Sequence, residues 1–110
     1  MVHSQIRDIG ESDLSGLFRK DNKLKVVEFY ETNSGTCEMM LPLFERASME
    51  FSDDVHFYRL DVSGLDDLKS TYHMGIRPLF LFIKDGVIID KVAGLVPLNR
   101  ISNMINTHIS

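Results

Sequence analysis

Hydrophobic residues along the chain gather into short blocks of two kinds, and these predict strands alternating with helices. Two blocks, Leu24–Tyr30 and Val55–Val62, are rich in β-branched and aromatic residues and predict buried strands. Two further blocks, Pro78–Ile83 and Val87–Val92, are joined by a Lys-Asp-Gly turn. An Asp-Gly pair between apolar runs is a strong hairpin signal, so these two strands are expected to be antiparallel neighbours.

Between these blocks the hydrophobic residues recur every three or four positions, which is the spacing of a helix face. Pro42 falls inside the longest such pattern, where a proline should kink the helix. Ser12 and Asp13 can cap a first helix, Ser63 can open a short one, and Pro97 suits the first turn of a last one. The apolar residues on the four predicted helices are Leu14, Leu17, Phe18, Met40, Leu43, Phe44, Ala47, Phe51, Leu65, Leu68, Tyr72, Leu98, Ile101 and Ile105.

The predicted order of elements is (β)αβαβαββα, in which the segment SQIRDI is a candidate edge strand. Strands and helices alternate in the first half, which predicts parallel strands with right-handed crossovers. The second half adds a hairpin and a helix, so the expected fold is α/β, a mixed central sheet with helices on both faces. A length of 110 residues suits one compact domain, residues 1–110, and we find no repeat or linker.

Composition narrows the class of protein. The chain is 44% hydrophobic and 25% charged, which is typical of a soluble globular domain. No apolar run approaches the roughly 18 residues of a membrane span, and the N-terminal segment has no signal pattern, so we expect a cytoplasmic protein. The net charge is −4, and the lysines and arginines are scattered. Nucleic acid is therefore not expected as a partner, because phosphate contacts need concentrated positive charge.

Cysteine usage is the sharpest constraint. The chain has a single cysteine, Cys37, which excludes an intrachain disulfide and a structural zinc site built from thiolates. The four histidines, His3, His56, His73 and His108, show no spacing typical of metal ligands. We therefore expect neither a metal nor a cofactor.

Cys37 closes the stretch NSGTC, which lies between a predicted strand and a predicted helix. This layout often carries a thiol site of the form Cys-x-x-Cys, but here Ser34 takes the first position. The longer stretch VVEFYETNSGTCEMMLPLFE resembles the strand, active-site turn and kinked helix of the thioredoxin family. In this resemblance Cys37 falls on the second cysteine of the motif, and Pro42 falls on the kinking proline.

A second stretch, YHMGIRPLFLFIKDG, is similar to the segment that carries the family's cis-proline, with Pro78 at that position. Gly94 matches a glycine that lets neighbouring backbone approach the site. The resemblance spans nearly the whole chain and implies a thioredoxin fold. Three departures stand out: Asn33 replaces the usual tryptophan, Ser34 replaces the nucleophilic cysteine, and Arg77 replaces an apolar residue before the proline.

The turn residues have both structural and chemical interpretations. Serine is a preferred N-cap, so Ser34 can simply cap the helix; as a nucleophile it would need a base, and none is apparent nearby. For Cys37 the helix N-terminus favours a thiolate, whereas burial opposes it, and a lone cysteine often acts as a small buried hydrophobe. Both interpretations of Cys37 remain open at this point.

Glu28 interrupts an otherwise apolar strand, where a carboxylate is costly unless paired. By resemblance it is the buried acid that handles the proton of the resolving thiol; otherwise it reaches the sheet end or a lysine such as Lys25 or Lys91. Pro78 is expected to present the backbone of Arg77 to an extended partner segment. The charge of Arg77 could then favour a thiolate or an acidic partner.

Two functions remain in competition, and they leave open whether the chain is an enzyme. The first is thioredoxin-like thiol–disulfide exchange in cell redox homeostasis, with Cys37 acting alone and glutathione or a thioredoxin-reductase-like protein as a further partner. The second is a redox-inactive binding module, a monomer that holds an extended peptide or protein segment in the site groove. The serine is either natural or a replacement introduced to stop turnover. The groove residues are Asn33, Ser34, Gly35, Thr36, Cys37, Arg77, Pro78 and Gly94.

Overall fold

The computed structural model describes residues 4–109, and in this range the chain forms five strands, three α-helices and one 3-10 helix. Every strand and helix predicted from the sequence is present, with small shifts at the ends. The elements follow one another as β1 (Ile6–Ile9), η1 (Glu11–Phe18), β2 (Leu24–Tyr30), α1 (Gly35–Glu50), β3 (Val55–Asp61), α2 (Asp66–Thr71), β4 (Leu79–Lys84), β5 (Val87–Ala93) and α3 (Leu98–His108).

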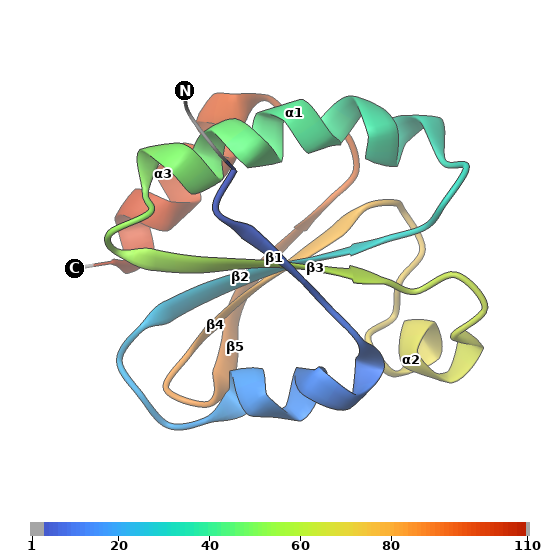
Figure 1. Ribbon diagram of the computed structural model, residues 1–110, viewed down its shortest axis with the longest axis horizontal. Coiled ribbons are helices and arrows are strands. Elements are labelled where there is room, and N and C mark those ends of the chain that lie inside the picture. Colours follow the sequence, from blue (N-terminus) through green and yellow to red (C-terminus); the bar gives the residue numbers. More distant parts are fainter. Residues whose placement is uncertain (1–3, 110) are drawn as a thin grey trace.

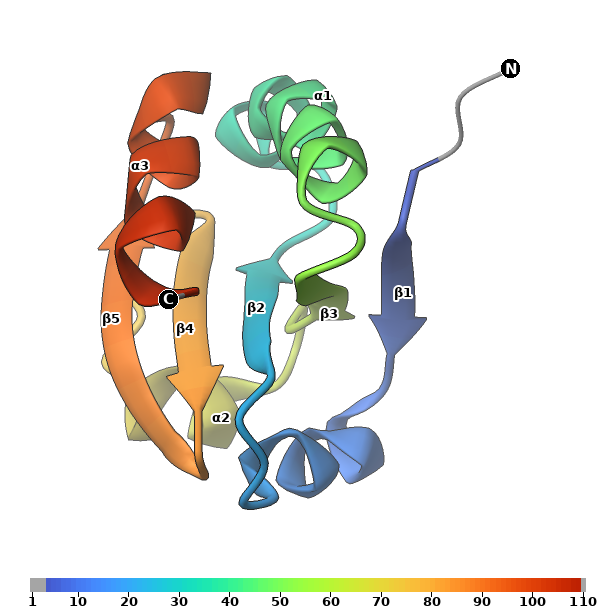
Figure 2. The ribbon, with the colours of Figure 1, turned by 90° about the vertical axis from the view of Figure 1, so that its left-hand side faces the viewer.

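The strands form one mixed sheet in the order β1-β3-β2-β4-β5. Strands β1, β3 and β2 are parallel, whereas β4 is antiparallel to both β2 and β5. Figure 2 shows this order, with β2 in the centre and β1 and β5 at the edges. The alternating first half and the hairpin of the second half are thus confirmed, and so is SQIRDI as an edge strand. At the tight turn between β4 and β5, Asp85 and Gly86 both have positive φ.

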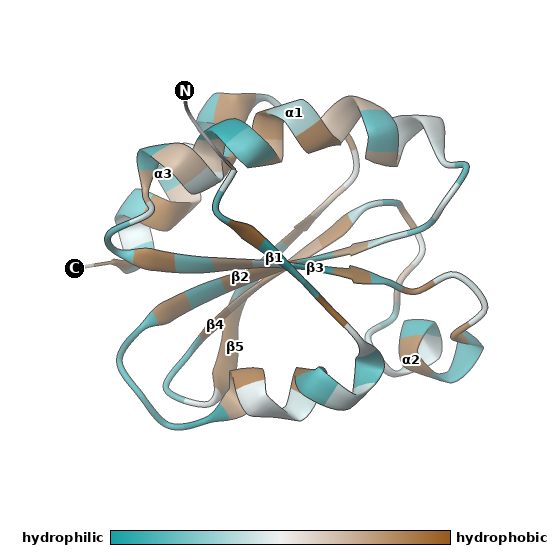
Figure 3. Ribbon diagram, in the orientation of Figure 1, coloured by the Kyte–Doolittle hydropathy of each residue, from teal (hydrophilic) through white to brown (hydrophobic). Residues whose placement is uncertain are grey.

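Helices cover both faces of the sheet and create two hydrophobic cores. Helices α1 and α3 lie on one face, and η1 and α2 lie on the other (Figure 1). On the α1 face the Phe44 ring packs edge-on against Phe57 and Phe80, with centroids 5.8 and 5.0 Å away. Figure 3 shows hydrophobic stretches along the strands between the two helix layers. Strand β2 supplies side chains to both cores, because successive residues point to opposite faces.

Three local details differ from the sequence prediction. The first helix is a 3-10 helix whose N-cap is Gly10, not Ser12; Asp13 Oδ2 accepts a hydrogen bond from the Gly10 N–H at 2.9 Å. Ser63 does not cap α2, because its hydroxyl instead accepts from the N–H of Thr32 at 3.0 Å. Pro97 is the N-cap residue of α3, one position before the first turn. Helix and strand ends commonly shift by a residue or two.

The helices within residues 4–109 are too short or too polar to cross a lipid bilayer.

Candidate functional site

The pairing of the strands brings the candidate site residues to one end of the sheet. Residue Phe29, near the end of β2, pairs with Leu79 at the start of β4, and Leu79 also pairs with Ala93 at the end of β5. Pro78 and Gly94 directly adjoin these paired residues, and the turn before α1 directly follows β2. Three segments far apart in the sequence therefore lie at this end of the sheet.

The turn before α1 is closed by a helix cap. Asn33 adopts a left-handed backbone conformation, with φ of 62°, which reverses the chain before the helix. Ser34 follows in an extended conformation as the N-cap, and its Oγ accepts a hydrogen bond from the N–H of Cys37 at 3.4 Å. The cap satisfies one of the backbone donors that a helix leaves free in its first turn.

A chain of hydroxyl groups links this cap to the loop at Pro78. Thr36 Oγ1 donates to the carbonyl oxygen of Arg77 at 3.0 Å, and it lies 3.2 Å from Ser34 Oγ. A threonine hydroxyl has one hydrogen, and a carbonyl can only accept. Ser34 must therefore donate to Thr36, while its own oxygen accepts from the helix. The serine at position 34 is thus built into the site through both its donor and its acceptor capacity.

Replacing Ser34 with alanine is expected to lower the free energy of unfolding by about 1 kcal/mol, because the first turn loses its side-chain cap. Urea denaturation followed by circular dichroism measures the change. Thr36→Val is the matched control, since it removes the link to Arg77 but keeps the cap. A loss as large in Thr36→Val as in Ser34→Ala would assign the effect to the hydroxyl chain rather than to the cap.

The Pro78 loop is fixed by backbone contacts. The Arg77–Pro78 peptide bond is cis, and the N–H of Gly94 donates to the carbonyl oxygen of Pro78 at 2.8 Å. Gly94 has φ of +90°, and a Cβ at this position would lie 3.0 Å from Ile76 Cγ2. Both the backbone conformation and the close approach favour glycine here.

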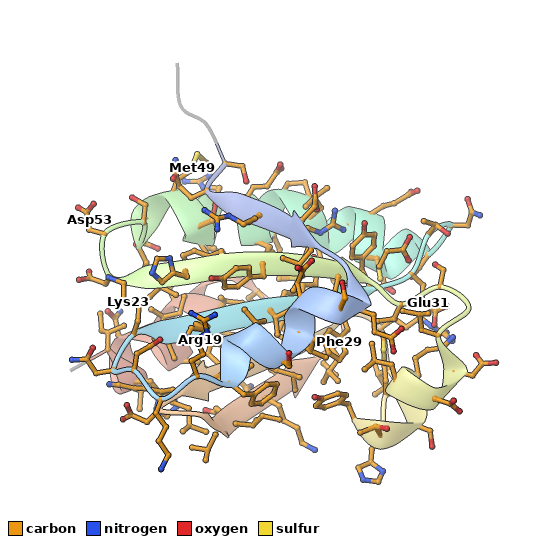
Figure 4. The ribbon with its side chains drawn as sticks, turned by 60° about the horizontal axis from the view of Figure 1, so that its bottom comes forward. Arg19, Lys23, Phe29, Glu31, Met49 and Asp53 are labelled. Carbon is orange, nitrogen blue, oxygen red and sulfur yellow. The ribbon has the colours of Figure 1, made fainter. Side chains whose placement is uncertain are left out.

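The side chain of Arg77 belongs to an ion-pair cluster that the sequence did not reveal. Glu31 Oε1 accepts a hydrogen bond from Lys69 Nζ at 2.9 Å, and it forms an ion pair with Arg77, whose Nε lies 3.1 Å away. Figure 4 shows Glu31 at the end of the molecule that carries α2, the helix of Lys69. The hydrogen bond from Lys69, reinforced by Arg77, holds the pKa of Glu31 below its ordinary value. The cluster joins the end of β2, α2 and the Pro78 loop.

Glu28 is fully buried and points toward α1. Its Oε1 accepts from Arg59 Nε at 2.6 Å, whereas its Oε2 has no hydrogen-bond partner among the described residues. The partner is therefore neither Lys25, which pairs with Asp21, nor Lys91. Burial raises the pKa of the Glu28 carboxyl, and the Arg59 guanidinium offsets only part of this effect.

Arg59 is a candidate site residue that the sequence analysis did not single out. It pairs directly with Glu28 across the parallel strands, and both residues are fifth in their seven-residue strands. The sequence signal for this ion pair was a charged residue at the same position in two largely apolar strands. The guanidinium carbon of Arg59 also lies 3.7 Å from the centre of the Tyr30 ring. This stacking orients the arginine toward the carboxylate.

The stability of the protein should fall less steeply with rising pH in Glu28→Gln than in the wild type. Because the folded pKa of Glu28 is raised above the ordinary 4.5, the folded chain binds its proton more tightly than the unfolded chain. The stabilisation from this group is complete below the ordinary value and is lost as the pH rises through the folded pKa. Glutamine does not titrate and removes this loss.

Urea denaturation between about pH 4 and about pH 8 measures this effect as a growing stability difference in favour of Glu28→Gln. Glu38→Gln is the control, because it removes an exposed carboxylate from the same end of the molecule. Parallel pH profiles for Glu28→Gln and the wild type would contradict a raised pKa at Glu28.

Cys37 lies in the first turn of α1 and is 2% exposed. It lines a surface hollow of about 320 Å³ together with Tyr30, Glu31, Thr32, Asn33, Glu38, Leu41 and Arg59. Arg59, which pairs with Glu28, and Glu31, which pairs with Arg77, thus line the same hollow as Cys37. Within residues 4–109 no group of histidine, cysteine and carboxylate side chains is arranged to hold a metal ion, and His3 lies outside this range.

This geometry defines a class of protein. A mixed sheet of this topology, a thiol in the first turn of the helix after its central strand, and a proline loop facing that turn together indicate a thioredoxin-fold redox protein. Residues 9–107 match the family model for thioredoxin. The chain therefore belongs to the thioredoxin family, and its function is thioredoxin-like.

The individual comparisons agree with this membership. Thioredoxin-2 of Saccharomyces cerevisiae is 34% identical over 94 residues, which make up 86% of this chain and 88% of that protein. A solved thioredoxin from Nicotiana alata has a TM-score of 0.86 at 28% identity, covering 97% of this chain and 95% of that one. A solved thioredoxin from Malassezia sympodialis has a TM-score of 0.85 at 28% identity, covering 100% and 96%.

Proposed function

We propose that this protein carries out thiol–disulfide exchange with protein partners through one sulfur, that of Cys37. The observation that carries the proposal is the position of this thiol. It lies in the first turn of α1 and lines an open hollow. In the same turn, Thr36 Oγ1 donates a hydrogen bond to the carbonyl oxygen of Arg77, the residue before Pro78. Ser34 occupies the position where the family has its attacking cysteine, so the usual reaction cycle with two thiols cannot take place.

The exchange takes place in two balanced steps. First, the Cys37 thiolate attacks a partner disulfide, forms a mixed disulfide, and releases the partner's second sulfur as a thiolate. Next, an external thiolate such as that of glutathione attacks the partner's sulfur in the mixed disulfide. A new disulfide forms between the external thiol and the partner, and the bond to Cys37 breaks. Cys37 leaves as a thiolate and is ready for another round. The external thiol is the reductant, and no second cysteine is needed.

In this proposal the neighbouring residues each have a part. Glu28 holds or accepts a proton near the buried thiol, and its orientation depends on Arg59. The turn residues and the Pro78 loop bind an extended segment of the partner. The chain acts as a single domain, residues 1–110, and as a cytoplasmic monomer, with a thioredoxin-reductase-like protein as a further partner. The groove residues that would contact the segment are Asn33, Gly35, Thr36, Arg77, Pro78 and Gly94.

Labelling of Cys37 with iodoacetamide, with and without urea, tests the proposal. Because Cys37 is 2% exposed, labelling of the folded protein should be slower than labelling of the unfolded chain. It should nevertheless be faster than global unfolding allows, since only the first turn of α1 has to open. Labelling that occurs solely at the rate of global unfolding would make Cys37 a structural thiol. The groove would then be a binding surface without redox activity.

A further inference from the structure

The proposed exchange makes no use of the charge of Arg77, although the structure holds this side chain in place. The side chain is 47% exposed, and its Nε lies 3.1 Å from Glu31 Oε1 in an ion pair. The same Glu31 oxygen accepts from Lys69, so the carboxylate is itself fixed from a second direction. Arg77 is therefore oriented before any partner arrives, which reduces the side-chain entropy lost on binding.

The outer edge of the Arg77 guanidinium is available to a ligand. A guanidinium has five N–H donors, and the Glu31 carboxylate approaches the guanidinium of Arg77 on its Nε side. Its terminal nitrogens make no hydrogen bond to other residues within the described chain. Two parallel N–H groups on this edge match the two oxygens of a carboxylate.

The charges around Arg77 favour an anion at this edge. One carboxylate, Glu31, is shared by two cations, Lys69 and Arg77, which leaves an excess of one positive charge in the cluster. Asp66 lies 3.4 Å from Lys69 but is 90% exposed, so water screens it strongly. A carboxylate from a partner would restore the balance at Arg77.

The hollow beside Cys37 is less favourable to an anion. It is bordered by the exposed carboxylate of Glu38, and the cation among its lining residues, Arg59, is already paired with Glu28. An acidic residue of a partner is therefore disfavoured in the hollow and favoured at the free edge of Arg77. The site therefore selects partner segments by the position of their acidic residue.

The backbone of Arg77 adds a second anchor for such a segment. Its carbonyl oxygen is engaged by Thr36 Oγ1, whereas its N–H makes no hydrogen bond to the rest of residues 4–109. A carbonyl group of an extended segment can accept from this N–H, in the manner of an added strand. A side chain next to that carbonyl is then within reach of the guanidinium of the same residue.

We propose that Arg77 is a specificity-determining residue, which selects partner segments carrying Asp or Glu within two residues of the exchanging cysteine. The partner's carboxylate binds the terminal nitrogens of Arg77 while the backbone N–H of Arg77 holds the segment. This selection rests on the proposed function, because it concerns the partner of the same exchange. An apolar residue before Pro78 could not bind a partner's carboxylate in this way.

A set of paired peptides tests the selection. Each short peptide has one cysteine in a disulfide with 4-nitrobenzenethiol, which carries no carboxylate of its own, and each pair differs only in Glu or Gln at one position within two residues of the cysteine. Cys37 attacks the peptide sulfur, the disulfide breaks, and its electron pair leaves with the coloured thiolate, which is measured by absorbance. The Glu peptide of the best pair should react roughly three- to tenfold faster than its Gln partner.

The preference should disappear in Arg77→Gln and persist in Arg19→Gln, which removes the same charge from the C-cap of η1. Figure 4 shows Arg19 apart from Glu31, the ion-pair partner of Arg77. Equal rates for Glu and Gln peptides in the wild type would overturn the selection while leaving the exchange intact. If neither peptide reacts, the proposed exchange fails, and the selection is tested separately. Serine versions of the peptides then report affinity by fluorescence anisotropy, and equal affinities would overturn the role of Arg77.

Discussion

Replacing Ser34 with cysteine should raise the rate of disulfide reduction by on the order of 10²-fold or more, because it supplies the missing attacking thiol next to a resolving one. Ser34 Oγ lies 3.4 Å from the Cys37 backbone nitrogen, and Ser34 is partly exposed whereas Cys37 is buried. The new thiol is thus the accessible one. A mixed disulfide formed at position 34 is resolved within the chain, so it no longer waits for an external thiol.

Reduction of insulin disulfides by dithiothreitol, followed by turbidity, measures this gain. The double variant Ser34→Cys, Cys37→Ala is the matched control, because it can attack but cannot resolve, and it should accumulate mixed disulfides. Loss of the serine cap should lower the free energy of unfolding by about 1 kcal/mol in both variants. A Ser34→Cys variant that is folded but no faster than the wild type would show that the site differs from a thioredoxin site in more than one sulfur.

Replacing Cys37 with alanine should reduce thiol–disulfide exchange to the uncatalysed background, since the chain has no other cysteine. The nitrobenzenethiol peptides should release no colour above the rate seen without protein. The protein should still fold, because the change removes one buried sulfur atom and costs about 1 kcal/mol. Thermal denaturation by circular dichroism checks the fold.

Ser34→Ala is the control for this experiment. It alters the same helix turn but keeps the sulfur, so it should retain measurable exchange. Peptide exchange that persists in Cys37→Ala would exclude Cys37 as the reacting group. Equal loss in both variants would instead assign the effect to the shape of the turn.

Local sequence patterns predicted the elements of the fold well. The bounds of β2 match the predicted strand residue for residue, because all its neighbours in the sheet bury it and its composition is correspondingly apolar. The Asp85-Gly86 turn fixed the hairpin, since few residues adopt positive φ easily. The 3-10 form of η1 was missed, because hydrophobic spacing over eight residues does not separate it from an α-helix.

The candidate site was predictable only in part. The cap at Ser34 follows from local chemistry, and the resemblance placed Pro78 and Gly94 near it. The partners of the charged residues did not follow, because each is far away in the sequence. Arg59 is 31 residues from Glu28 and becomes its neighbour only through the register of two parallel strands. Register depends on the whole sheet, which no short window of sequence contains.

The central position of β2 has a consequence for the exchange of protons with water. This strand has a neighbour on both sides and a core on both faces, so its amide hydrogens should exchange with deuterium only when the whole domain opens. The Glu28 carboxyl belongs to the same strand, yet its partner Arg59 is 15% exposed. A swing of the Arg59 side chain therefore offers the carboxyl a route to solvent that the backbone of β2 lacks. Strand β2 would thus combine the slowest-exchanging backbone amides of the protein with a side-chain carboxyl that exchanges protons with water without unfolding.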